Sequence, residues 1–112
     1  MKWYDNLYVG ESIRHKAEKI KWKIRHNAGQ IEIYVIAIAS NPQNLLDIIP
    51  AQELMQRGYP KKDLYIIGLA HGMKEAQDVV TQIIDEVYRN TCGFDIMPYL
   101  QAKKDSKNHG WN

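Results

Sequence analysis

Cysteine is almost absent from the sequence, where Cys92 stands alone among 112 residues. A single thiol cannot close an intramolecular disulfide, and it cannot supply the paired ligands of a cysteine-based zinc site. Nothing near Cys92 in the sequence would activate it as a nucleophile, so we interpret it as a structural thiol at a helix end. These absences exclude a fold that is held together by disulfides or by Cys-ligated zinc.

Long hydrophobic runs are also missing. The longest one, residues 33–39, is far too short to span a bilayer, and residues 1–6 lack the apolar segment of a secretory signal peptide. We therefore expect a cytoplasmic protein with no membrane partner. The composition, with 45% hydrophobic and 25% charged residues, is typical of globular proteins. At this length it predicts a single α/β domain over residues 1–100, followed by a polar C-terminal tail over residues 101–112.

Motifs for cofactors, metals and catalysis do not occur in the sequence. It contains neither the glycine spacing of a dinucleotide-binding fingerprint nor that of a phosphate-binding P-loop, and it lacks the G-x-S-x-G turn of a serine hydrolase. The four histidines show no metal-ligand spacing: His15, His26, His71 and His109. The sequence thus predicts no cofactor and no metal site, and it favours a protein without enzymatic activity.

One stretch of sequence occurs twice. Residues 32–39, EIYVIAIA, return 31 residues later as residues 63–70, DLYIIGLA, with an identical or conservatively replaced residue at each position. Both stretches are apolar and largely β-branched, which is typical of strands buried on both faces, as in parallel sheets. A helix is predicted after each copy. The second helix covers residues 73–91, and the first has an apolar face made of Leu45, Leu46, Ile48 and Ile49.

Two strand–helix units in series predict a right-handed crossover in which both strands run parallel in one sheet. We therefore predict an α/β fold with a small parallel sheet of two or three strands. The tandem βα units follow an N-terminal helix, in the order α-β-α-β-α, and the helices pack on the sheet. Residues 3–9 are either an edge strand or an extended arm. Because so small a sheet leaves edges that invite pairing, we expect a homodimer.

A basic amphipathic helix is predicted over residues 12–27. Its apolar residues recur at spacings of three and four: Ile13, Ala17, Ile20 and Ile24. Around this stripe lies a candidate partner surface made of Arg14, Lys16, Lys19, Trp22, Lys23 and Arg25. Cations bind phosphates and tryptophan stacks on bases, so nucleic acid is one candidate partner and a second protein is the other. A pI near 8.6 is modest for a nucleic-acid-binding protein, and a solvated helix face is the simpler alternative.

A second candidate site lies where the two predicted strands end. Ligands of open α/β sheets bind beyond the carboxyl ends of parallel strands, next to helix N-termini. The residues at these ends form a candidate ligand or anion site: Ser40, Asn41, His71, Gly72 and Lys74. The repeat places Ser40 and His71 at equivalent offsets, which would allow them to meet as a nucleophile and its base. Helix capping by the same residues is the simpler interpretation.

The leading hypothesis is a small non-enzymatic α/β module that self-associates or binds a macromolecular partner. That partner is either a protein or a nucleic acid, and it is bound through the basic helix or a sheet edge. The alternative is a small-molecule, anion or hydrolytic site at Ser40 and His71.

Overall fold

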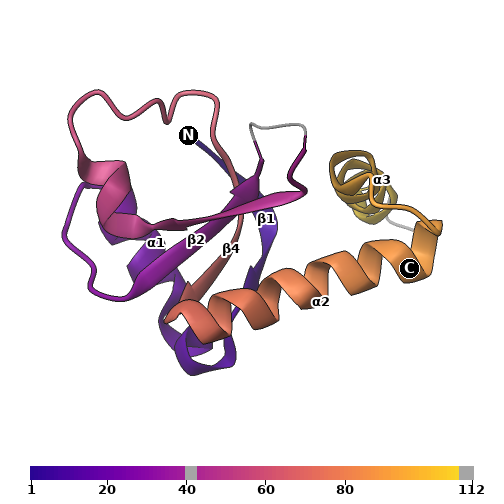
Figure 1. Ribbon diagram of the computed structural model, residues 1–112, viewed down its shortest axis with the longest axis horizontal. Helices are drawn as coiled ribbons and strands as arrows, with labels where there is room; N and C mark the ends of the chain where they lie inside the picture. The colour runs from indigo at the N-terminus through magenta and orange to yellow at the C-terminus, as the bar shows by residue number, and fades with distance from the viewer. Residues whose placement is uncertain (40–42, 109–112) are drawn as a thin grey trace.

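The computed structural model describes residues 1–39 and 43–108. Within these ranges the chain forms four strands: β1 (Lys2–Val9), β2 (Ile33–Ile38), β3 (Leu46–Pro50) and β4 (Tyr65–His71). The helices are η1 (Glu11–Lys16) and η2 (Ala51–Met55), which are short 3-10 helices, and α1 (Ala17–Arg25), α2 (Met73–Thr91) and α3 (Ile96–Asn108). The described strands form one mixed sheet in the order β1-β4-β2-β3 (Figure 1).

The prediction of a two- or three-stranded parallel sheet from tandem βα units is wrong. β2 and β4 contain the two copies of the repeated stretch and are neighbours, but they run antiparallel, with Ile33 opposite His71 and Ala37 opposite Ile66. Among the described strands, β1 and β4 are the parallel pair. The chain also begins with a strand, and the order α-β-α-β-α is therefore not observed.

The segment between the two copies explains the error. Residues predicted as a helix form β3, which pairs with β2 as an antiparallel hairpin that places Val35 opposite Ile49. Pro42 and Pro50 bracket this segment, so a helix there would have at most about two turns. Pro50 also disfavours the helical conformation at Ile49, and β-branched Ile48 and Ile49 favour a strand. After β3 the chain returns along residues 56–64 and enters β4 in the direction opposite to β2.

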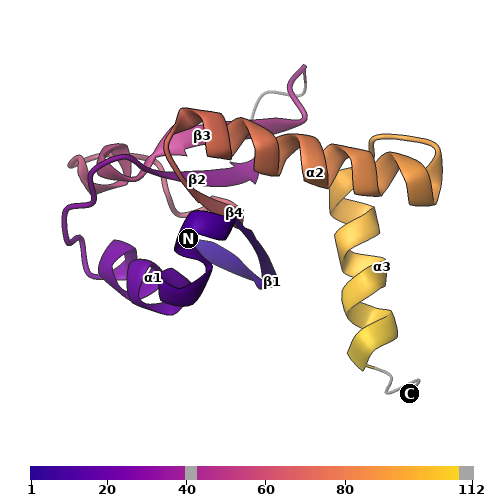
Figure 2. The same cartoon turned by 90° about the horizontal axis from the view of Figure 1, so that it is seen from below.

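Helices cover both faces of the sheet (Figure 2). Successive residues of β2 point to opposite faces, with Val35 packed in the layer under α1 and Ile36 packed in the layer under α2. Helix α1 buries Ile20 in the first layer, and α2 buries Ile83 in the second. The apolar pattern of the repeated stretch thus reflects burial on both faces, which a mixed sheet provides as well as a parallel one.

β1 is an edge strand, which decides between the two predictions for residues 3–9. It approaches β4 closely at Gly68, where an added Cβ would lie 2.9 Å from the carbonyl oxygen of Tyr8 and 3.3 Å from the Cβ of Ile36. Glycine therefore suits this position better than any residue with a side chain. In Figure 2, α1 and α3 extend on the same side of the molecule, with β1 between them. α3 continues to Asn108, through most of the segment predicted as a polar tail.

Candidate functional site

Helix α1 turns its apolar residues inward and its cations outward. Ile20 and Ile24 are buried against the sheet, so the basic residues that alternate with them are divided between two flanks of the helix. Lys21 and Arg25 lie on the flank toward β1, where both contact the ring of Trp3. The opposite flank, toward the start of β2, carries Lys19 and Lys23, and Lys16 at the end of η1 lines the same cavity.

The cations of this helix differ from those of the other helices in their lack of acidic partners. Where their side chains are described, the cations of α2 and α3 are ion-paired: Lys74 with Asp78, Arg89 with Asp85, Lys103 with Glu86 and Lys104 with Asp5. Between Lys16 and Arg25 there are five Lys or Arg residues, and none of them forms an ion pair within the described part of the chain. An uncompensated group of cations creates a positive potential that attracts anions.

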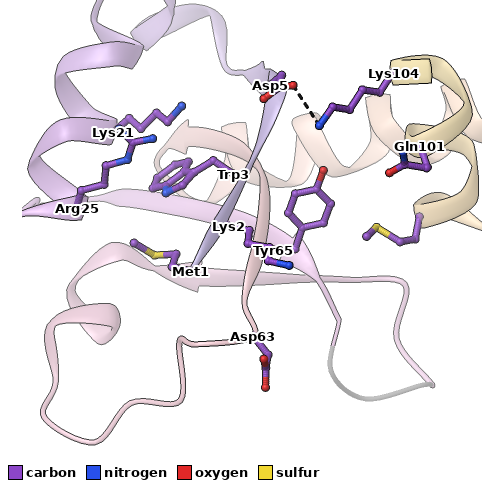
Figure 3. Close-up of a pocket in the computed structure, with 11 residues that line it drawn as sticks. Met1, Lys2, Trp3, Asp5, Lys21, Arg25, Asp63, Tyr65, Gln101 and Lys104 are labelled. Carbon is purple, nitrogen blue, oxygen red and sulfur yellow. Dashed lines mark ion pairs between the residues drawn. The ribbon is translucent and has the colours of Figure 1, made fainter. Parts of the chain in front are cut away.

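A groove of about 690 Å³ lies beside β1, between α1 and α3 (Figure 3). Trp3 lines it, with Lys21 Nζ 5.4 Å and Arg25 Cζ 5.8 Å from the centre of its ring. On the α3 side, Lys104 forms an ion pair with Asp5 at 3.3 Å. The groove therefore combines cations, an aromatic ring and an edge of the described sheet with two carboxylates, Asp5, which is paired with Lys104, and Asp63. We call it the β1 groove.

Trp22 lies on the outer surface of α1 and is 57% exposed. Its ring stacks on that of His26, with the centroids 4.0 Å apart and an interplanar angle of 23°. His26 is held in turn by a 2.7 Å hydrogen bond between its Nδ1 and the carbonyl oxygen of Trp22. The indole is thus presented to solvent in a defined orientation, as a surface on which another flat ring can stack.

Arg14 is the member of the predicted partner surface that lies apart from the others. It belongs to η1, lies 3.9 Å from the carboxylate of Glu11, and lines a separate cavity with Glu75 and Asp78. Acidic neighbours make this cavity a poor place for an anion. The predicted surface therefore reduces to the α1 residues and Lys16.

The strand-end site predicted from the repeat depended on parallel strands, and this premise is wrong. Because β2 and β4 are antiparallel, Ile38 at the end of β2 and His71 at the end of β4 lie at opposite ends of the strand pair. Ser40 and Asn41 lie outside the described residues. Lys74 is engaged with Asp78 at 3.1 Å. The end of β2 and the end of β4 therefore do not lie side by side, as the predicted site requires.

Protein groups already occupy the backbone donors at the end of β4. The His71 N–H donates to Glu75 Oε1 at 2.8 Å, and the Gly72 N–H donates to the carbonyl oxygen of Glu32 at 2.7 Å. Ser12 Oγ also donates to Glu75, at 2.8 Å. Burial alone would raise the pKa of Glu75, but the hydrogen bonds from His71 and Ser12 outweigh it and hold this pKa below its usual value. The carboxylate of Glu75 thus takes the place that the sequence suggested for an external anion.

A cluster around Glu86 joins three elements that are distant in sequence. The Tyr8 and Tyr99 hydroxyls donate to Glu86 Oε2 at 2.8 and 2.7 Å, and Lys103 Nζ donates to the same oxygen at 2.9 Å. Burial would raise the pKa of Glu86, but the bonds from Lys103 and the two tyrosines lower it overall. Burial and the Glu86 carboxylate together raise the pKa of Tyr99 to about 12. The three donors meet on one carboxylate oxygen, so we assign the cluster the role of fixing α3 against β1 and α2.

This cluster predicts acid sensitivity. A carboxyl whose pKa is lowered by folding stabilises the fold above its unfolded pKa, near 4.5, and this contribution is lost as the pH falls through the folded value. Chemical denaturation at pH 7 and pH 3 should show a smaller loss of stability for Glu86→Gln than for the wild type. The control Glu18→Gln removes the same charge from an exposed position on α1. It should lose as much stability between pH 7 and pH 3 as the wild type does. An unchanged difference in Glu86→Gln would contradict the assigned role.

The sequence did not point to Trp3 or Lys104 as site residues. The aromatic-rich N-terminal segment, residues 3–9, was a signal for Trp3. Lys104 reaches the β1 groove only through the tertiary packing of α3. Among the described residues, no three His, Cys, Asp or Glu side chains gather closely enough to bind a metal ion, and no helix is long and apolar enough to cross a membrane. No protein-family model, curated protein or solved structure matches this chain.

Proposed function

We propose that this protein is a non-enzymatic module that binds single-stranded nucleic acid along α1 and the β1 groove. The observation that carries the proposal is the group of five cations from Lys16 to Arg25 that have no acidic partner in the described chain, next to the exposed ring of Trp22. The α1 cations and Trp22 were predicted as a partner surface, and the β1 groove extends that surface.

The distribution of charge supports an anionic polymer as the partner. The formal net charge is only +2, but α1 carries Glu18 as its single acid, whereas α2 carries Glu75, Asp78, Asp85 and Glu86. The chain is therefore polarised, with a positive surface over α1. Phosphates bound there would release their condensed counterions, which is the main source of affinity in sequence-independent binding.

The aromatic side chains favour a single strand over a duplex. Stacking of an unpaired base on an aromatic ring contributes about 1–3 kcal/mol, and paired bases are not available for it. Trp22 presents its ring on the outer surface of α1, and Trp3 lines the adjoining groove with Lys21 and Arg25 near its ring. A flexible strand can place phosphates on Lys21 and Arg25 while its bases reach these rings.

The salt dependence of binding tests the proposal. Fluorescence anisotropy with a labelled, mixed-sequence strand of about 12 nucleotides should show binding at low salt. If three to five phosphates are neutralised, the slope of log K against log salt concentration should be roughly −2 to −3.5. A duplex of the same sequence should bind more weakly at equal salt. A flat salt response, or no binding at low salt, would remove the proposal.

Self-association is a second candidate, favoured by an apolar patch on α2 and the loop after it. Tyr88 and Phe94 stack with their ring centroids 5.3 Å apart, and each side chain is about half exposed, at 49% and 50%. Ile84 lies beside them, and two strand edges, β1 and β3, border the described sheet. A homodimer would appear in light scattering as a mass that doubles with rising concentration and returns to 13.0 kDa in Tyr88→Lys. A constant monomer mass would exclude it.

A further inference from the structure

A cavity of about 270 Å³ lies on the flank of α1 that faces away from the β1 groove. Its polar lining comes from three separate segments. Lys16, Lys19 and Lys23 line it from η1 and α1, Gln30 from the loop before β2, and His71 from the end of β4. Four isoleucines complete the wall. The cavity thus brings His71 together with lysines of the predicted partner surface, which the sequence had placed in two unrelated sites.

The charges around this cavity are one-sided. No acidic side chain of the described residues lines it, and its three lysines form no ion pair in that part of the chain. Two acids lie next to His71 outside the cavity: Glu32 Oε2 is 3.5 Å from His71 Nε2, and Glu75 Oε1 accepts the His71 backbone N–H. Glu32 is not part of the lining. Three like charges at helical spacings of three and four residues repel one another, and a bound anion would relieve this repulsion.

Gln30 supplies an independent observation. Its side-chain Nε2 is shielded from solvent and has no hydrogen-bond partner among residues 1–39 and 43–108. Shielded amide donors are nearly always paired in folded proteins, and a turn of the Gln30 side chain toward the cavity would give its Nε2 an acceptor on a bound ligand. Phosphate oxygens are strong acceptors, and they combine this capacity with the negative charge that the three lysines require.

We propose that this cavity binds a phosphomonoester group, with Lys16, Lys19 and Lys23 neutralising its charge and Gln30 Nε2 donating a hydrogen bond to one of its oxygens. The dianionic terminal phosphate matches a site with three cations better than the single charge of a diester does. Such a group occurs at the end of a nucleic-acid strand and on small phosphorylated molecules. The site goes beyond the proposed function, because it lies across α1 from Trp3 and does not require a bound strand.

Two titrations of the full chain test the site. In the first, inorganic phosphate at constant ionic strength should shift the NMR signals of the Gln30 side-chain amide and the His71 backbone amide, while an equal amount of chloride should not. In the second, a 5′-phosphorylated strand should bind about tenfold more tightly than its 5′-hydroxyl counterpart. A response in both titrations identifies a strand end as a ligand, and a response to phosphate alone identifies a small phosphorylated molecule.

Matched variants separate this site from the strand-binding surface. Gln30→Leu and, independently, Lys23→Gln should lose the phosphate response while the circular dichroism spectrum stays unchanged. Lys21→Gln, on the other flank of α1, should weaken binding of both strands and keep the phosphate response. If no strand binds but the phosphate response persists, the proposed function fails and the phosphate site stands. If Gln30 and His71 do not respond to phosphate and no 5′-phosphate preference exists, the phosphate site is overturned.

Discussion

Replacing Lys21 and Arg25 together by glutamate is expected to weaken binding of single-stranded nucleic acid by roughly 10- to 100-fold, because two charge-assisted contacts to phosphate are lost and replaced by repulsion. Both side chains lie over the ring of Trp3 in the β1 groove and have no acidic partner among the described residues. They can therefore bind phosphates without breaking an ion pair. The salt slope should also become shallower, by about 0.7 unit for each single-strand phosphate contact that is lost.

The matched control for this variant is on α2. Lys74→Glu with Arg89→Glu changes the net charge by the same amount, but the two wild-type cations are already paired with Asp78 and Asp85 on the opposite part of the molecule. Anisotropy titrations at one salt concentration should show a small decrease for this control, caused by net charge alone. Equal losses in the two double variants would mean that binding follows net charge and that the α1 surface has no special role.

Gly68→Val is expected to reduce the free energy of unfolding by about 3 kcal/mol, at the upper end of the cost of overpacking a core. An added Cβ would lie 2.9 Å from the Tyr8 carbonyl oxygen and 3.3 Å from the Ile36 Cβ, and the two valine methyl groups would need still more room. Neither neighbour yields easily, because the first belongs to the backbone of β1 and the second is fully buried. The strands would have to separate.

Urea denaturation of Gly68→Val and Gly29→Val measures this effect. An added Cβ at Gly29 meets no atom of the described residues within 4 Å, so its substitution should change stability by no more than about 0.5 kcal/mol. The comparison tests whether β1 lies next to β4 and whether β4 lies next to β2. A loss at Gly68 as small as that at Gly29 would show that this packing, and with it the sheet order, is incorrect.

The sequence predicted local elements better than their pairing. The stripe that contains Ile20 and Ile24 correctly indicated a buried helix face, but the helix predicted over residues 12–27 is divided into the 3-10 helix η1 and the shorter α1. Residues 73–91 form α2 as expected. The two copies of the repeat also supply β2 and β4. Strand direction was mispredicted because apolar, β-branched residues report burial on both faces and carry no information on direction. That information resided in Pro42 and Pro50, which leave too little room for a crossover helix.

The α1 part of the candidate site could be predicted from the sequence, but the β1 groove and the cavity with Gln30 and His71 could not. Charge and exposure along α1 follow from helical periodicity, so Trp22 and Lys23 could be assigned to a surface from the sequence. The β1 groove could not be assigned, because Trp3 and Lys104 are about a hundred residues apart and meet only when α3 packs beside β1. The cavity with Gln30 and His71 depends in the same way on the antiparallel pairing of β2 and β4, which brings the start of one strand to the end of the other.

An NMR titration of the amide-labelled full chain with a mixed-sequence single strand tests the central claim most directly. We expect the largest shifts in residues 16–26 and in the first half of β1, together with the indole signals of Trp3 and Trp22. Little change is expected on the exposed face of α2 around Asp85. Shifts centred on α2, or a spectrum that does not change at low salt, would contradict the claim that α1 and the β1 groove form a nucleic-acid-binding surface.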